Sequence, residues 1–263
     1  MIRLVRAEIS KLVTIWSTYV LLGITTLATG LIGLAIGLAP HRRGIEALLF
    51  PARGTPAWFH FVFSAMAISE DLALVLGILL VTTEYRHKTV TPTYLGEPRR
   101  GRVTAAKLVV SVAGGVVVAV AAAVGALVLG GALAGSGYGD TSIMLGAFGH
   151  VFPGVLLASL LFAIYGVGLG AILKNQVVAL VVGLGVSAVV EPIIVGVWPS
   201  VGRWLPSQAA RSIESVSTTA SGGGFGSGLS NLLPSWEGAL VLLAYGVVLA
   251  AAGSFTTLRA DVT

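Results

Sequence analysis

The sequence predicts an all-α integral membrane protein with six transmembrane helices and a short amphipathic helix before the first of them. Of its 263 residues, 56% are hydrophobic and only 10% are charged, whereas a soluble domain carries about 25% charged residues. The apolar residues form six runs, each long enough for the ~20 residues that a span requires. Because the connections are short, residues 1–263 are expected to form one transmembrane domain without a large soluble part.

The start of the chain has a pattern of its own. Apolar Ile2, Val5 and Ile9 alternate with charged Arg3 and Lys11 at roughly helical spacing. This pattern predicts an amphipathic helix at residues 1–15 that lies in the inner membrane interface; the alternative is the basic start of the first span. The spans themselves are expected at residues 17–39, 58–83, 105–133, 148–173, 177–198 and 236–258.

The distribution of basic residues predicts the orientation of the chain. With both termini in the cytoplasm, the inner segments hold eleven of the sixteen Lys and Arg residues, and the outer segments hold five. The positive-inside rule favours this multi-pass topology. The net charge of +5 is then explained by loops that face anionic lipid headgroups, and no nucleic acid is expected as a partner.

Several classes of chemistry lack the residues they need. The chain has no cysteine, which excludes thiol chemistry and disulfides. It contains neither a P-loop pattern nor a dinucleotide fingerprint, and neither a G-x-S-x-G elbow nor an H-E-x-x-H pair. His60 and His150 fall near the outer ends of two spans, but their spacing has no metal-site signature. We therefore expect no catalytic residue, no metal site and no cofactor in this chain.

Three acidic residues are expected within membrane spans, where a charged side chain costs free energy. Glu70 and Asp71 fall within the second span, and Glu191 precedes Pro192 in the outer half of the fifth. Intramembrane carboxylates usually face a cavity or a partner, so these residues are candidates for a translocation path. Glu70 and Asp71 would instead lie at the outer interface if the span were tilted or broken, and Glu191 could cap a helix that breaks at the proline.

A basic loop separates the second and third predicted spans. It runs from Glu84 to Lys107 and holds six of the sixteen Lys and Arg residues. Such a loop is expected in the cytoplasm. Its proline, glycine and threonine content suggests a shaped element that docks onto a partner, although its charges could also serve only to orient the chain.

Four stretches resemble one family, the six-span permease subunits of type-2 ATP-binding-cassette exporters in bacterial drug export or antibiotic immunity. The most specific is T-T-E-Y-R-H-K-T-V at 82–90 with P-R-R-G-R-V-T-A-A-K at 98–107, which is similar to the family's first cytoplasmic loop. The others are the amphipathic start with Arg3, Glu8 and Lys11, which is similar to the family's R-x-E-x-x-K entry helix, then W-L-P-S-Q-A-A at 204–210, and the closing L-R-A-D-V at 258–262, where Ala260 replaces the family's second arginine.

The resemblance implies a permease of the bacterial cell membrane that works as a dimer, with a second copy or a related permease. Each permease would dock on a cytoplasmic ATPase subunit that carries ATP and magnesium. The loop at 84–100 would be the coupling helix, and residues 1–14 the interfacial helix. The expected coupling residues are Glu84, Tyr85, Arg86, Thr89, Thr91, Glu97, Arg99 and Arg100.

Other functions stay open at this point. An ion-coupled secondary transporter could use Glu70, Asp71 and Glu191 as a proton relay. An intramembrane enzyme would need a catalytic pair on adjacent spans, and a membrane anchor or sensor would have little need for three intramembrane acids. The expected cargo of the exporter is a small amphipathic molecule, drug, peptide or lipid-like compound.

Overall fold

The computed structural model describes residues 2–14, 16–39, 51–89, 100–214 and 232–259, and every regular element in these ranges is a helix. Six helical segments are long and apolar enough to cross a membrane: Trp16–Leu38, Pro56–Arg86, Gly101–Tyr138, Thr141–Leu173, Gln176–Val197 and Ser235–Gly253. The all-α fold class and the six spans predicted from the sequence are thereby confirmed, and most of the boundaries agree within a few residues.

Three of the spans are single uninterrupted helices. They are α2 (Trp16–Leu38), α7 (Thr141–Leu173) and α12 (Ser235–Arg259). The third span is α6 (Arg100–Leu133), which ends in a π-helical turn, η3 (Ala134–Tyr138). Ahead of the spans, α1 (Ile2–Thr14) forms the helix that the amphipathic pattern predicts.

The second and fifth spans are each built from several pieces. The second consists of α3 (Pro56–Phe63), a 3₁₀ turn η2 (Ser64–Ala67) and α4 (Ile68–Arg86). The fifth consists of α8 (Gln176–Gly185), a π-helical turn η4 (Val186–Val190) and α9 (Glu191–Val197). The irregular turn therefore lies directly before Glu191-Pro192, where the proline predicts a break, since proline removes a backbone donor. Interruptions of this kind are frequent at functional sites.

The segment after the fifth span is more ordered than a loop. The sequence predicts a long loop at residues 199–235, but two short helices form there, α10 (Pro199–Gly202) and α11 (Pro206–Ile213). The hydrophobic pattern is hard to read in pieces this short, because an eight-residue helix offers only two turns. Tertiary packing holds α11, which contacts α12 and α7.

The centre of the molecule is a close contact between α4 and α7. A Cβ atom on Gly77 would overlap the carbonyl oxygen of Ala163, and one on Gly166 would overlap the carbonyl oxygen of Leu74. Gly168 makes a similar approach to α12, where an added Cβ would lie 3.0 Å from the oxygen of Gly246. Small residues allow membrane helices to pack backbone to backbone, so α4, α7 and α12 form a tightly packed centre.

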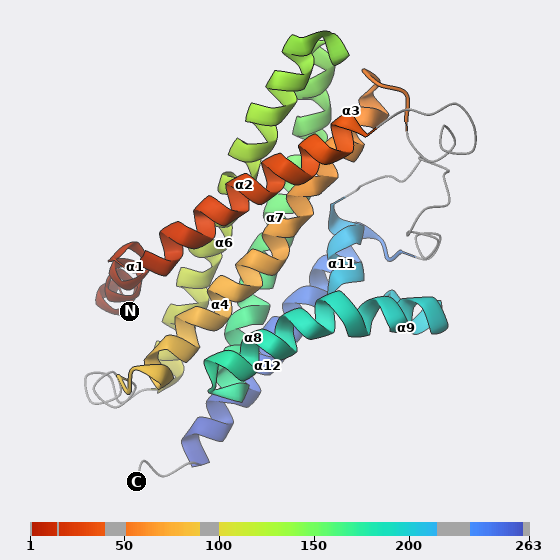
Figure 1. Cartoon of the computed structure of the whole chain (residues 1–263). Coiled ribbons are helices and arrows are strands. Elements are labelled where there is room, and N and C mark those ends of the chain that lie inside the picture. The colour runs from red at the N-terminus through yellow and green to blue at the C-terminus, as the bar shows by residue number, and fades with distance from the viewer. Residues whose placement is uncertain (1, 15, 40–50, 90–99, 215–231, 260–263) are drawn as a thin grey trace.

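The first and fifth spans lie at the periphery. In their apolar stretches, 28% (α2) and 17% (α8–α9) of the residues are buried inside the chain; α12 also has 28% of its residues buried, although one of its faces packs closely against α7. In Figure 1, α8 and α9 cross the lower part of the molecule, whereas α2 and α4 run together above them. The α1 end of the chain, the end of α4 and the end of α12 lie at the same end of the molecule (Figure 1), as an even number of spans requires.

Candidate functional site

Helix α4 carries predicted site residues at both of its ends. Glu70 and Asp71 lie in its first turn, and Glu84, Tyr85 and Arg86 lie near its last residue. Fourteen residues separate Glu70 from Glu84, which corresponds to about 21 Å along the helix. One rigid element therefore connects the acidic region to the start of the basic loop.

A chain of hydrogen bonds connects two of the three predicted path acids, Asp71 and Glu191, and Glu70 is the residue before Asp71 in α4. Ser187 in η4 donates a hydrogen bond from Oγ to Oδ1 of Asp71, with an O···O distance of 2.9 Å. Its Oγ is also 3.2 Å from Oγ of Ser207 in α11. The backbone N–H of Ser207 donates to Oε2 of Glu191 at 2.8 Å. This chain of hydrogen bonds joins α4, η4, α9 and α11.

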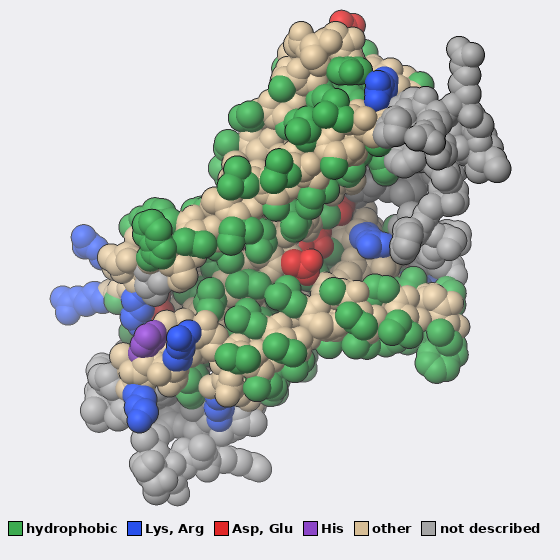
Figure 2. Space-filling model, viewed as in Figure 1, with side chains coloured by type: hydrophobic (Ala, Val, Ile, Leu, Met, Phe, Trp, Pro, Cys, Tyr) green, Lys and Arg blue, Asp and Glu red, His purple; other side chains and the backbone are tan. Residues whose placement is uncertain are grey.

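A fourth acid, Glu214, belongs to the same group and was not predicted from the sequence. Its carboxyl group interacts with that of Glu70, and the two residues are only 3% and 7% exposed. Oε1 of each carboxyl group is buried without a hydrogen-bond partner among the described residues. We call Glu70, Asp71, Glu191 and Glu214 the acid cluster; Figure 2 shows acidic side chains in a hollow between the α2–α4 and α8–α9 segments.

One arginine lies near the acid cluster. Arg211 in α11 interacts electrostatically with Glu70, Glu191 and Glu214, although it forms no ion pair within 4.0 Å with them. Burial raises the pKa of Glu214, while the hydrogen bond with Glu70 and the charge of Arg211 offset part of that increase. Four carboxyl groups near one guanidinium leave an excess of negative charge that favours a cation or protonation.

The position of Glu214 depends on close packing between α11 and α7. A Cβ atom on Gly154 of α7 would lie 2.5 Å from Cα of Glu214 and 2.7 Å from the carbonyl oxygen of Ile213. Only glycine allows the end of α11 to approach α7 this closely. The sequence signal that could have revealed this region is the alternation of polar and apolar residues in P-S-Q-A-A-R-S-I at 206–213, which is amphipathic at helical spacing.

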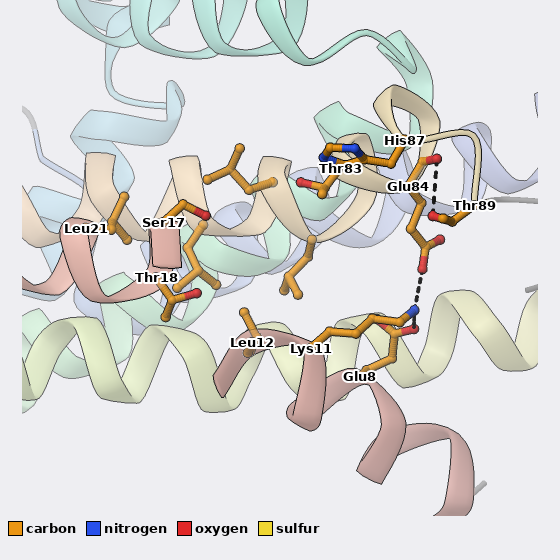
Figure 3. Close-up of a pocket in the computed structure, with 13 residues that line it drawn as sticks. Glu8, Lys11, Leu12, Ser17, Thr18, Leu21, Thr83, Glu84, His87 and Thr89 are labelled. Atoms are coloured by element: carbon orange, nitrogen blue, oxygen red, sulfur yellow. Dashed lines mark hydrogen bonds and ion pairs between the residues drawn. The ribbon is translucent and has the colours of Figure 1, made fainter. Parts of the chain in front are cut away.

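The other end of α4 carries a balanced set of charges, which we call the inner ion network: Glu8, Lys11, Glu84 and Lys107. Nζ of Lys11 lies 2.7 Å from Glu8 Oε1 and 2.6 Å from Glu84 Oε1. Nζ of Lys107 lies 3.1 Å from Glu8 Oε2 and 3.0 Å from Glu84 Oε1, and it also donates to the carbonyl oxygen of Leu80 at 3.0 Å. Figure 3 shows Lys11 reaching from α1 towards Glu84.

The inner ion network is largely shielded from solvent. The side chains of Glu8, Lys107 and Glu84 are 4%, 7% and 11% exposed, whereas that of Lys11 is 42% exposed. Burial lowers the pKa of Lys11, but its hydrogen bonds and attraction to Glu8 and Glu84 outweigh burial, and the net shift is upward. Since α1, α4 and α6 each contribute charges, the network fastens three helices at the end of the molecule that the sequence predicts to face the cytoplasm.

The predicted coupling residues fall into two groups: those whose contacts the structure describes and those that lie outside the described residues. Glu84 directs its carboxylate to lysines of the same chain, Tyr85 is half-buried, and Arg86 is exposed and donates to Gln176 Oε1 at 3.3 Å. The exposed Thr89 donates its backbone N–H to the carbonyl oxygen of Glu84 at 2.9 Å. Thr91, Glu97 and Arg99 lie outside the described residues. Arg100 begins α6, and its side chain is also outside the described part.

A metal site has little geometric basis in the described ranges. No group of three or more His, Asp or Glu residues there is arranged to hold an ion. The rings of His60 and His150 lie near each other, with centroids 5.2 Å apart, and two imidazoles without a third ligand make an incomplete site.

Comparison of the chain with protein-family models and with curated proteins finds no match in either set.

Proposed function

We propose that this chain is the membrane-spanning permease subunit of an ATP-binding-cassette exporter. It would pair with a second permease, either another copy or a related chain, and with a cytoplasmic ATPase dimer that binds ATP and magnesium. The chain itself would catalyse no reaction. The sequence resemblance supports the family, and the arrangement of α4 supports the mechanism.

The observation that carries the proposal is that α4 spans the distance between the inner ion network and the acid cluster. Force applied to the loop that follows α4 would reach α1 and α6 through Glu84, Lys11 and Lys107. The same force would be transmitted along α4 to Glu70 and Asp71. Because Gly77 and Gly166 hold α4 tightly against α7, the two helices are suited to move as one body rather than to bend separately.

The acid cluster supports a role in cargo passage. Its four acids lie between α4, which belongs to the packed centre, and the segment formed by η4, α9 and α11. Intramembrane carboxylates of this kind mark substrate or ion pathways. Among amphipathic cargoes, the excess of carboxyl groups over Arg211 favours molecules that carry an amine or another cationic group. Alternating access would open the cluster to either side as the ATPases close and separate.

Co-purification tests the proposal. Tagged protein extracted in mild detergent is expected to bring down a P-loop ATPase in stoichiometric amount, with vanadate-sensitive ATP hydrolysis. Arg99→Glu with Arg100→Glu is expected to abolish this association without affecting membrane insertion. The matched control is Arg42→Glu with Arg43→Glu, a second arginine pair that is expected on the outer side from the distribution of basic residues. If the two double variants retain the ATPase equally, the loop does not dock.

The path is tested separately by transport. Glu70→Gln with Asp71→Asn is expected to change the range of exported compounds more than it changes expression, since it removes charge from the acid cluster at nearly constant volume. Glu237→Gln, at the start of α12, is the control. An unchanged export profile in the double variant would remove Glu70 and Asp71 from the path.

The interaction of Glu70 with Glu214 favours a second candidate, an ion-coupled secondary transporter. Two facing carboxyl groups can share a proton, and a relay would use such a pair with Asp71 and Glu191. The two mechanisms respond differently to inhibitors. An ATP-driven exporter is stopped by vanadate and continues when an ionophore removes the proton gradient, whereas a secondary transporter shows the reverse.

A further inference from the structure

A cavity lies beside the inner ion network, between the α1–α2 segment and α4. Its volume is about 540 Å³, within the range of about 300–1,000 Å³ that is common for small-molecule sites. Figure 3 shows its walls: α1 and α2 contribute one side, and the last turns of α4 contribute the other. We call it the inner cavity.

The inner cavity has an apolar part and a polar part. Leu21 of α2 and Leu76 and Leu79 of α4 line the apolar part, which extends into the span. Glu8, Lys11, Glu84 and His87 line the polar part, at the end of α4. Leu76 and His87 are eleven residues apart, or about 16 Å along the helix. A molecule that fills the cavity must therefore be amphipathic, with its polar end at the inner membrane surface.

The end of the molecule that holds the polar part carries more basic than acidic residues. The described residues at this end of the molecule include two acids, Glu8 and Glu84, which the lysines of the inner ion network already neutralise. Figure 2 shows Lys, Arg and His side chains gathered there. The described basic residues at this end are Arg3, Arg6, Lys11, Arg86, Lys88, Arg102, Lys107 and Lys174.

We propose that the inner cavity binds one anionic phospholipid of the inner leaflet. An acyl chain would lie along the leucines, and the phosphate would accept a hydrogen bond from Lys11. An ammonium group has three N–H donors, and in the described structure two of those of Lys11 are directed to Glu8 and Glu84. The partial exposure of Lys11 leaves it accessible to a headgroup. The leucine-lined part extends along α2 and α4, which favours a ligand with an acyl chain over a fully polar one.

The bound lipid would connect α1 to α4. Its tail would fill the space between the two helices, and its headgroup would extend the inner ion network towards the membrane surface. Anionic lipid would thereby secure the inner end of α4. This site is independent of the proposed transport function, because the cavity and its charges are properties of the fold.

Thermal unfolding in detergent tests the site with two added lipids. Phosphatidylglycerol at about 100 times its Kd is expected to raise the Tm of the wild-type protein by roughly 5 °C or more, whereas phosphatidylcholine has a much smaller effect. Leu79→Trp places a larger side chain in the cavity and is expected to lose most of this shift. Leu27→Trp, on the exposed side of α2, is the matched control and is expected to keep it. Equal shifts in the two variants, or with the two lipids, would overturn the proposal.

A measurement on the wild-type protein covers the case in which Leu79→Trp does not fold. Native mass spectra are expected to retain one phosphatidylglycerol per chain under activation that removes phosphatidylcholine. Removal of both lipids at the same activation energy would refute a specific anionic site. The spectra detect lipid binding without an ATPase or cargo, so failure here leaves the exporter proposal untouched.

Discussion

The two ends of α4 handle buried charge in opposite ways. At the inner end, two carboxylates and two ammonium groups form four ion pairs of 2.6–3.1 Å. At the other end, the acid cluster has four carboxyl groups, and the cation that interacts with three of them is Arg211. The hydroxyl group of Ser187 and the backbone N–H of Ser207 donate to Asp71 and Glu191, while Oε1 of Glu70 and of Glu214 has no hydrogen-bond partner among the described residues.

The difference indicates different tasks for the two regions. A balanced, fully paired set of charges resists change, because removal of one member leaves another charge buried without a partner. An excess of one charge responds to whatever cation or proton arrives. We therefore regard the inner ion network as a fastening between helices and the acid cluster as the region that changes during function.

The largest expected loss of stability comes from removing one member of the inner ion network. Lys107→Met leaves Glu8 and Glu84 to share Lys11, and it is expected to destabilise the protein by about 3–5 kcal/mol. Denaturant unfolding in detergent measures the loss. Arg6→Met removes an exposed charge from the same helix as Glu8, and it is expected to cost under about 0.5 kcal/mol. Similar losses in the two variants would show that the inner ion network contributes no special stability.

The second-largest expected loss of stability comes from the contact between α4 and α7, which lies between the inner ion network and the acid cluster. Gly166→Ala drives a methyl group into the backbone of α4 at Leu74 and is expected to cost about 1–3 kcal/mol. Gly146→Ala on the same helix meets no atom within 4 Å and is expected to be neutral or slightly stabilising. Thermal unfolding compares the two. A neutral Gly166→Ala would mean that α4 and α7 are not held as one body.

Glu214→Gln should change how stability depends on pH. The pKa of Glu214 is raised above its ordinary value of 4.5 by burial, so the folded protein holds a proton that the unfolded chain releases. The stabilising contribution is therefore complete below about pH 4.5 and is lost as pH rises through the folded pKa.

The wild-type protein should lose stability over that window with a slope of up to about 1.4 kcal/mol per pH unit from this group, and Glu214→Gln should flatten the slope. Unfolding curves between pH 5 and 9 measure both, with Glu237→Gln as the control that keeps the wild-type slope. Parallel curves for wild type and Glu214→Gln would contradict the assignment.

The smallest expected loss of stability comes from a serine hydroxyl group that bonds to the acid cluster. Ser187→Ala removes the donor to Asp71 and the partner of Ser207, and it is expected to cost about 0.5–1.5 kcal/mol. Ser10→Ala, an exposed serine that bonds to the backbone of its own helix, serves as the reference. If Ser187→Ala lost more stability than Lys107→Met, the acid cluster, and not the inner ion network, would be the region that holds the helices together.

How well the sequence predicts a region depends on how far apart in the chain its interacting residues lie. The spans and the three acids Glu70, Asp71 and Glu191 were predictable, because a charged residue within an apolar run is visible locally. The inner ion network was not, since Lys11 and Glu84 are 73 positions apart and Lys107 and Glu8 are 99 apart. Lys107 looked like one more cation of the loop, and only the fold shows that it is buried.

Glu214 was missed for a related reason. It follows a helix of eight residues in a segment polar enough to be taken for a loop. Its burial depends on the contact between the end of α11 and Gly154, sixty positions earlier. The amphipathic spacing of residues 206–213 indicates a helix, but no local pattern encodes its contact with Gly154, so the burial of Glu214 follows only from the packing of α11 against α7.

The loose attachment of α2 and of the α8–α9 span has an evolutionary consequence. Each position on their outward faces, such as Leu27, Val181 or Ile193, can exchange one apolar residue for another at little cost to the fold. The glycines between α4 and α7 have no such freedom. Sequence drift and selection for new partners would therefore concentrate on such exposed faces, while the contact between α4 and α7 preserves the fold.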